Sequence, residues 1–189
     1  MSRSSGRRSS TAACTPAASA TPTATALVSG GVDGTGGFDV LRTLFYVATR
    51  KSPGVALGPV DLSCAFVVCD LALPDNPIIH ASDAFQTLTG YARREVLGKN
   101  PRFLQSPDGL VDPGSRREYV APDAVGKLKR AVVDRSEAQI ALLNYRRGGT
   151  PFVNLLTLIP VPWDSADQQP RYCLGFMLDL VDNPDAIAP

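Results

Sequence analysis

The sequence predicts an α+β fold, in which a five-stranded antiparallel sheet carries short helices on one face. Two segments rich in β-branched and aromatic residues, 63–71 and 77–82, come first. Three more segments of strand character, 137–147, 150–161 and 171–181, close the chain. Between these groups, apolar residues recur at helical spacing. Strands on both sides of a run of short helices indicate one sheet with the helices on one side.

The N-terminal 37 residues differ in composition from the rest. Residues 2–26 are rich in Arg, Ser, Thr, Ala and Pro and contain no acidic or aromatic residue. Such a segment cannot bury enough apolar surface to offset the entropy lost on ordering. The glycine cluster 30–37 is typical of a flexible linker. We therefore expect a disordered tail and linker over residues 1–37.

An amphipathic helix is predicted over residues 38–50, followed by a linker that ends at residue 59. Its apolar residues recur at spacings of three and four: Phe38, Leu41, Leu44, Phe45 and Ala48. The linker separates this helix from the compact unit, so the apolar face must dock either on that unit or on a partner. The sequence favours neither alternative.

Short helices follow the first two strands. The turn at 74–76 joins those strands, and Ser82 or Asp83 can cap a helix over 84–90. A second helical piece covers 91–98. The stretch 98-GKNPRFLQSPDG-109 then offers Asn100 as the N-cap of another helix, with Pro101 at its first position. Proline fits there, because the amide it lacks would have no helical partner.

One longer helix is expected over 123–135, with Val125, Leu128 and Val132 inward and several cations on its flank. The last three strands follow. Gly148 and Gly149 join the first two of them as a hairpin.

Asn144 and Asn154 lie in these otherwise apolar strands. A buried carboxamide costs a few kcal/mol unless its donors and acceptors are paired. The two side chains therefore either bond to the backbone at a bulge or rim, or face the edge of a planar polar ligand.

Composition excludes several function classes. The chain has 189 residues, of which 44% are apolar, and this fits one domain with tails. Its net charge of +1 produces no strong positive potential that would attract nucleic acid. The apolar run 153–163 is too short to span a bilayer. Four cysteines without C-x-x-C spacing and one histidine predict a reduced, intracellular protein without a metal site. No nucleophile, base or acid cluster indicates an enzyme.

Three segments resemble LOV domains, the flavin-binding branch of the PAS family, and most of all those of the fungal White Collar blue-light photoreceptors. These are 64-CAFVVCDLALPDNPIIHASDAFQTLTGYARREVLGKNPRFLQSPDG-109, 141-ALLNYRRGGTPFVNLLTLIPV-161 and 173-CLGFMLDLVDNPDAI-187. The resemblance covers about residues 38–187, and its central motif is G-x-N-C-R-F-L-Q. It implies the PAS/LOV fold with an N-terminal helical cap. The domain is then expected at 60–183, with a tail at 184–189.

Two positions depart from the family pattern. Pro101 stands where the family has the cysteine that adds to the flavin ring after blue-light excitation, so this chain cannot form that adduct. Met177 stands where the family usually has a glutamine facing flavin N5. Methionine is a polarizable filler and only a weak acceptor, so it cannot relay a changed hydrogen bond by rotating an amide.

The remaining binding residues of the family are present. The resemblance places Asn100 and Gln105 beside the ring and ribityl chain, Asn144 and Asn154 at the pyrimidine edge, and Arg102 and Lys129 at the phosphate. A guanidinium suits bidentate phosphate binding, whereas a solvated helix face is the alternative for these cations. The long loop 106–122 is similar to that of fungal LOV domains that hold FAD. Arg116 or Arg117 could meet the pyrophosphate, and Arg117 matches better. FAD is therefore preferred over FMN.

Two functions are compatible with this sequence. In the first, the chain is a flavin-binding sensory domain for light or redox signalling to transcription, without the cysteinyl photocycle. In the second, it is a flavin-free, light-insensitive PAS interaction module. Either would pair with another PAS or LOV protein or with itself, through the cap helix and the sheet face, in the nucleus or cytoplasm. No direct contact with nucleic acid or membrane is expected.

Overall fold

The computed structural model describes residues 38–162 and 169–187. The disordered tail expected over 1–37 lies outside the described residues. Five strands form one antiparallel sheet in the order β2-β1-β5-β4-β3. They are β1 (Ala65–Asp70), β2 (Ile78–Ala81), β3 (Ala138–Tyr145), β4 (Pro151–Val161) and β5 (Tyr172–Asp179). The α+β fold predicted from the sequence is confirmed.

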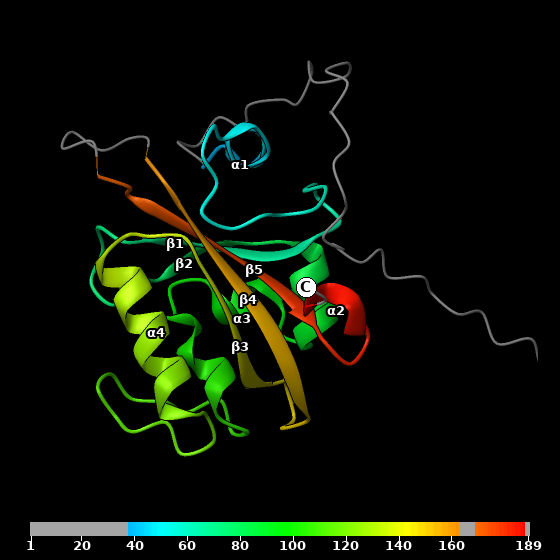
Figure 1. The fold of residues 1–189 in the computed structure, drawn as a ribbon. Coiled ribbons are helices and arrows are strands. Elements are labelled where there is room, and N and C mark those ends of the chain that lie inside the picture. The colour runs from blue at the N-terminus through cyan, green and yellow to red at the C-terminus, as the bar shows by residue number, and fades with distance from the viewer. Residues whose placement is uncertain (1–37, 163–168, 188–189) are drawn as a thin grey trace, which may run out of the picture.

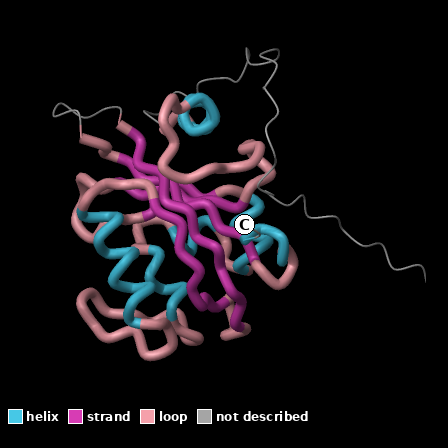
Figure 2. The backbone as a smooth tube through the Cα atoms, in the orientation of Figure 1, coloured by secondary structure: helices cyan, strands magenta, loops and turns pink. Residues whose placement is uncertain are grey.

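Helices lie on both sides of this sheet. α2, α3, η1 and α4 cover one face, and α1 crosses the other (Figures 1 and 2). The helices are α1 (Val40–Thr49), α2 (Asp83–Thr89), α3 (Arg93–Val96) and α4 (Pro122–Val133), with 3-10 helices η1 (Pro101–Gln105) and η2 (Pro184–Ile187).

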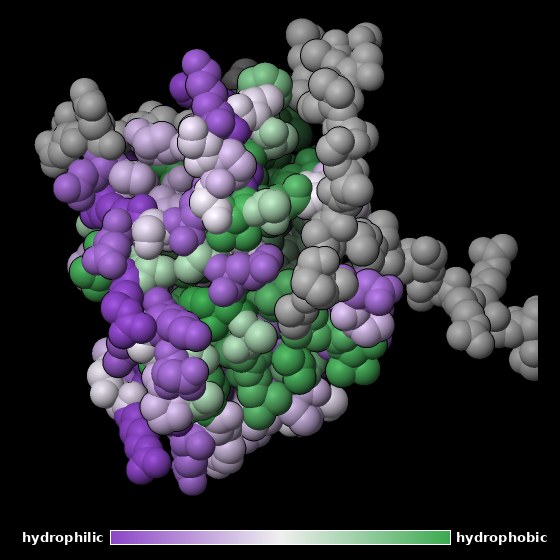
Figure 3. All heavy atoms as spheres, in the orientation of Figure 1, coloured by the Kyte–Doolittle hydropathy of each residue, from purple (hydrophilic) through white to green (hydrophobic). Residues whose placement is uncertain are grey.

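Two apolar clusters, one on each face, hold the layers together. The first contains Phe85, Phe103 and Leu104 between the short helices and the sheet. The second joins α1 to the opposite face through Phe66 and Leu174. Hydrophobic residues gather over the strands in Figure 3, whereas the outer side of α4 is hydrophilic. Successive residues of a strand point to opposite faces of the sheet, so the strands contribute side chains to both clusters.

Local signals in the sequence explain where the helices begin. The Ser82 hydroxyl accepts a hydrogen bond from the amide of Phe85, and α2 ends at Gly90 with φ of 76°. Asn100 caps η1, and Pro101 occupies its first turn. The expected helix after Asn100 is therefore present as a 3-10 helix.

The inward face of the cap helix differs from the prediction. Leu44 and Val47 are buried against the sheet, together with Thr43, but Leu41 is 39% exposed and Phe45 is 55% exposed. The spacing rule identified the helix correctly and placed its buried stripe wrongly. The helix docks on its own domain and still presents two large apolar side chains outward.

The last described residues pack on the domain. The expectation for 184–189 was a tail, but η2 covers Pro184–Ile187 and Ala186 is buried. The C-terminal boundary near residue 183 stays an expectation from the sequence.

A half-buried ion pair fastens the end of α1 to the start of β3. The Nε of Arg50 donates to Oε1 of Glu137 at 2.7 Å, and the amide of Val55 donates to Oε2 at 2.8 Å. Arg50 also donates to the carbonyls of Val47 and Val55. One carboxylate thus joins the cap helix, the linker and the sheet.

Replacing Glu137 with alanine should destabilise the protein by about 2 kcal/mol, because Arg50 is left half-buried without its counter-ion. Urea unfolding would measure the loss. Asp83→Ala is the control, since its ion pair with Arg93 is exposed and 3.9 Å long. Equal losses in the two variants would contradict the role given to Glu137.

Candidate functional site

A cavity of about 350 Å³ lies between the sheet and the helices η1 and α4. Its two long walls are apolar. The sheet contributes Val67, Leu142, Leu156 and Leu158, and α4 contributes Val125, Leu128 and Val132. The three residues predicted to face inward from this helix therefore line the cavity. Facing apolar walls suit a flat aromatic ligand.

The cavity brings together nearly all the site residues predicted from the sequence. Asn154 is the exception, since it does not line the cavity but contacts a residue that does. The residues that line it are Asn100, Pro101, Arg102, Gln105, Arg117, Lys129, Asn144 and Met177.

The two asparagines form a hydrogen-bonded pair in the sheet. Nδ2 of Asn154 donates to Oδ1 of Asn144 at 2.8 Å, and Nδ2 of Asn144 donates to the carbonyl of Leu143 at 2.8 Å. Asn154, fully buried, also accepts from the amide of Leu178. Each thus has partners in the sheet, which offsets the cost of burial. Asn144 alone borders the cavity, with Asn154 orienting it from behind.

The start of η1 contributes an arginine, Arg102, to the lining of the cavity. Oδ1 of Asn100 accepts from the amide of Arg102 at 3.0 Å. The guanidinium of Arg102 binds both carboxylate oxygens of Asp75. These hydrogen bonds hold the pKa of Asp75 below its ordinary value. Sequence reasoning missed this partner, because Asp75 belongs to the turn before β2.

Arg117 is the most enclosed cation of the site. Only 9% of it is exposed, and its Nε donates to Oε1 of Gln105 at 2.9 Å. Its Nη1 donates to the carbonyl and hydroxyl of Ser115 and to the carbonyl of Asp112. All these acceptors are uncharged. Burial, with the neighbouring cation of Arg102, lowers the pKa of Arg117.

Arg102 and Arg117 together make part of the cavity lining electropositive. Two arginines lie near enough to repel each other, and only Arg102 has a carboxylate partner there. A buried guanidinium whose hydrogen bonds go to neutral groups is stabilised by an added anion. Lys129 is exposed at the rim, and Arg116 is exposed outside it. Of the two loop arginines Arg116 and Arg117, Arg117 is the one that lines the cavity.

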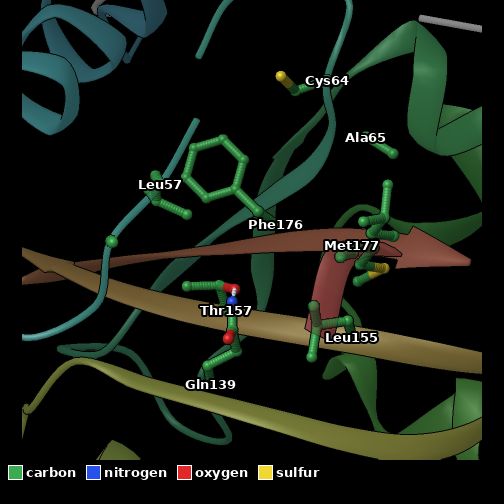
Figure 4. Close-up of a pocket in the computed structure, with 11 residues that line it drawn as sticks. Leu57, Cys64, Ala65, Gln139, Leu155, Thr157, Phe176 and Met177 are labelled. Atoms are coloured by element: carbon green, nitrogen blue, oxygen red, sulfur yellow. Dashed lines mark hydrogen bonds between the residues drawn. The ribbon is translucent and has the colours of Figure 1, made fainter. Parts of the chain in front are cut away.

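Met177 borders this cavity and also a smaller one on the other face of the sheet. The smaller cavity, of about 40 Å³, lies under the cap linker (Figure 4). Leu57 of the linker and Phe176 of β5 line it, and Gln139 donates to the hydroxyl of Thr157 at 3.0 Å within it. A side chain that contacts both cavities can transmit a change in one to the other.

Several residues of the large cavity were not predicted as site residues. Cys69 and Cys173 lie opposite each other on β1 and β5, and Asn76 follows Asp75 in the turn. Strand register, which sequence spacing leaves undefined, brings the cysteines together.

Neither a metal-binding cluster nor a membrane-spanning helix is found among the described residues. No group of three His, Cys, Asp or Glu side chains could hold a metal ion there. Within the same residues, no helix combines the length and apolar character needed to cross a membrane.

Comparisons with known proteins identify relatives of this chain. The family model for the PAS domain matches residues 63–182. White collar 1 protein of Neurospora crassa is 58% identical over 151 residues, which is 80% of this chain and 13% of that protein. Blue light receptor lreA of Aspergillus flavus is 48% identical, over 80% of this chain and 17% of the receptor. The chain thus spans less than a fifth of either relative.

Solved structures show the same fold. The photo-excited blue-light photoreceptor Vivid is 44% identical, with a TM-score of 0.72 over 76% of this chain and 97% of Vivid. A light-state dimer of Vivid is 43% identical, with a TM-score of 0.72 over 79% of this chain and 100% of that one.

Proposed function

Since this chain is a PAS domain of the LOV type, related to fungal blue-light receptors, we propose that it binds FAD and acts as a sensory domain without the cysteinyl photocycle. LOV domains bind a flavin, and the choice of FAD is part of the proposal. So is the loss of the photocycle, which follows from proline at position 101.

One observation carries this proposal. The large cavity has apolar walls and is lined by the buried amide of Asn144 and by the buried guanidinium of Arg117, whose hydrogen bonds go only to uncharged acceptors. A flavin carries chemical groups that match this lining: a planar ring with a polar edge, a polyol chain and a phosphate. Asn144 would meet the ring edge, and Arg117 would meet the phosphate through charge-assisted hydrogen bonds.

The remaining residues orient and enclose the ligand. Pro101 and Leu104 of η1 face the sheet across the cavity, and Gln105 is held by Arg117. A bound flavin supplies blue-light absorption and electron uptake. Met177 stands at the border with the cap-side cavity, where it can pass changes only by packing, because its thioether is a weak acceptor.

An absorption spectrum of protein purified from flavin-supplemented cells tests this function. We expect a structured band near about 450 nm, the mark of a protein-bound oxidised flavin. Its loss under blue light with a mild reductant, and its return in air, would support light or redox sensing. A folded, colourless protein that takes up neither FAD nor FMN would contradict the proposal and leave the flavin-free interaction module.

Replacing Met177 with glutamine should shift the flavin absorption band to longer wavelength, because an amide that donates to the ring stabilises its excited state more than a thioether does. Difference spectra of the two flavin-loaded proteins would measure the shift. Met177→Leu is the control, since it keeps the apolar volume and adds no donor. Identical shifts in both variants would place residue 177 away from the polar part of the ring.

Signalling would proceed through association with a second PAS domain. The cap helix leaves Phe45 55% exposed, and Leu62 in the following segment is 56% exposed. Apolar side chains at such a surface favour an interface. We assign the partner as a PAS or LOV protein or a second copy, with the response passed to transcription in the nucleus or cytoplasm. A concentration-dependent mass by light scattering, lost in Phe45→Glu, would support this interface.

A further inference from the structure

Cys69 and Cys173 form a pair of thiols in the wall of the large cavity. The two residues are direct partners in the register of β1 and β5. Directly opposed residues of antiparallel strands have Cα atoms about 4.5 to 5.5 Å apart, within the range of about 4.4 to 6.8 Å that a disulfide needs. Both cysteines are free.

Both side chains lie on the cavity face of the sheet. Each is buried from the outside, with 8% of Cys69 and 5% of Cys173 exposed, and each lines the cavity. The pairing of β1 with β2 is irregular between Val68 and Cys69. Such irregularities bend a strand and re-aim a side chain, whereas the register between β1 and β5, which a bridge would join, is unbroken.

We propose that Cys69 and Cys173 are a redox site, which a small peroxide reaching the cavity converts from two thiols to a cross-strand disulfide. One sulfur attacks a peroxide oxygen, the O–O bond breaks, and a sulfenic acid and one water form. The second sulfur then attacks the first, the S–O bond breaks, and a second water leaves. Hydrogen peroxide gains the two electrons that the thiols lose, and their two protons end in the waters.

Burial determines how readily this reaction proceeds. Loss of solvation raises the pKa of both thiols, that of Cys173 to about 12. The thiolate is the reactive form, so the pair resists traces of oxidant and responds to sustained exposure. Peroxide reaches the two sulfurs through the cavity that they line, so a ligand that fills this cavity shields the pair. The site would then sense oxidant when the cavity is empty.

The experiment treats the 189-residue chain with hydrogen peroxide, blocks the remaining thiols in denaturant and maps disulfides by mass spectrometry. Cleavage after Phe66 separates Cys64 from Cys69 and identifies the bridge. We expect a peptide pair joined through Cys69 and Cys173, with the loss of two hydrogens.

Cys69→Val should remove this bridge, and a dimedone-trapped sulfenic acid should remain at Cys173. Val67, two residues earlier on the same face, indicates that the strand accepts valine.

FAD protection tests the route to the pair. With FAD at 100 times its Kd, about one molecule in a hundred has an empty cavity, so bridge formation should slow about 100-fold. Equal rates in loaded and empty protein would overturn access through the cavity. Absence of the bridge in folded, flavin-free protein, when the same cysteines oxidise in urea, would overturn the redox site. The comparison of folded protein with protein in urea needs no flavin. A negative result there would contradict the redox site without bearing on flavin binding.

Discussion

Pro101→Cys should give the flavin-loaded protein a blue-light bleaching of its absorption band that recovers in the dark. The parent protein should show no such reversible bleaching in the absence of reductant. This is the largest expected change, since it creates a photoreaction that a chain with proline at this position cannot perform. From the family resemblance we expect residue 101 to lie beside the reactive face of the ring.

The local structure indicates that the fold will accept this change. Pro101 begins η1, and the cap is made by Asn100 through its hydrogen bond with the amide of Arg102. The first helical position favours proline but does not require it, because its amide lacks a helical partner in any residue. Pro101 also lines the cavity, so a thiol attached there lies near a bound ligand.

Pro101→Ser is the matched control. It removes the ring of proline and introduces a side chain of similar size to cysteine, but it has no sulfur. Absorption at the flavin band before, during and after a light pulse measures the response in both variants. Bleaching in the serine variant as well would assign the response to photoreduction. A stable cysteine variant that binds flavin and does not bleach would place residue 101 away from the reactive carbon.

The sequence predicted the elements well, because each carries a local signal. The Ser82 cap, the Gly90 stop and the Gly148–Gly149 hairpin all act within a few residues of their own position. The buried face of α1 was predicted less well. Leu41 and Phe45 follow the helical period as well as Leu44 does, and only the surface of the sheet decides which of them is covered.

The functional site, like the fold, was predicted from the sequence only in part. Eight of the nine site residues named from the sequence line the cavity. Four of them belong to the central motif, and the family resemblance supplied the others from their positions along the chain. The partners of those residues were not predictable. Asp75 reaches Arg102 through a turn in which Asp75 has φ of 66°, and Gln105 meets Arg117 across a loop. Such contacts depend on tertiary geometry, which neither composition nor periodicity encodes.

Asp75 also affects how Arg102 would bind the phosphate of a flavin. Its carboxylate already occupies the fork of Arg102, so a phosphate must share that guanidinium or displace the carboxylate. In either case Arg102 contributes less to the binding free energy of the phosphate, because one favourable contact replaces another. The guanidinium of Arg117 has no such competitor among its hydrogen-bond partners. Arg117 is therefore the cation on which phosphate affinity should depend most.

Replacing Arg117 with alanine should raise the Kd for FAD by about 10-fold to 150-fold, the equivalent of about 1.5 to 3 kcal/mol for hydrogen bonds to a charged group. Titration of the flavin-free protein, followed by flavin fluorescence, would measure it. Arg116→Ala is the matched control. It removes the same charge from the same loop, but its side chain is exposed and outside the cavity, so affinity should change little.

Riboflavin separates a phosphate contact from a structural role of Arg117. The guanidinium also holds Gln105 and the loop near Ser115, so its loss could disturb the cavity without any phosphate. Riboflavin has the same ring and ribityl chain and lacks the phosphate. If Arg117 binds phosphate, its removal weakens FAD and leaves riboflavin affinity nearly unchanged. If both ligands weaken equally, Arg117 supports the loop, and the anion-binding role would have to move to Arg102 with Asp75 displaced.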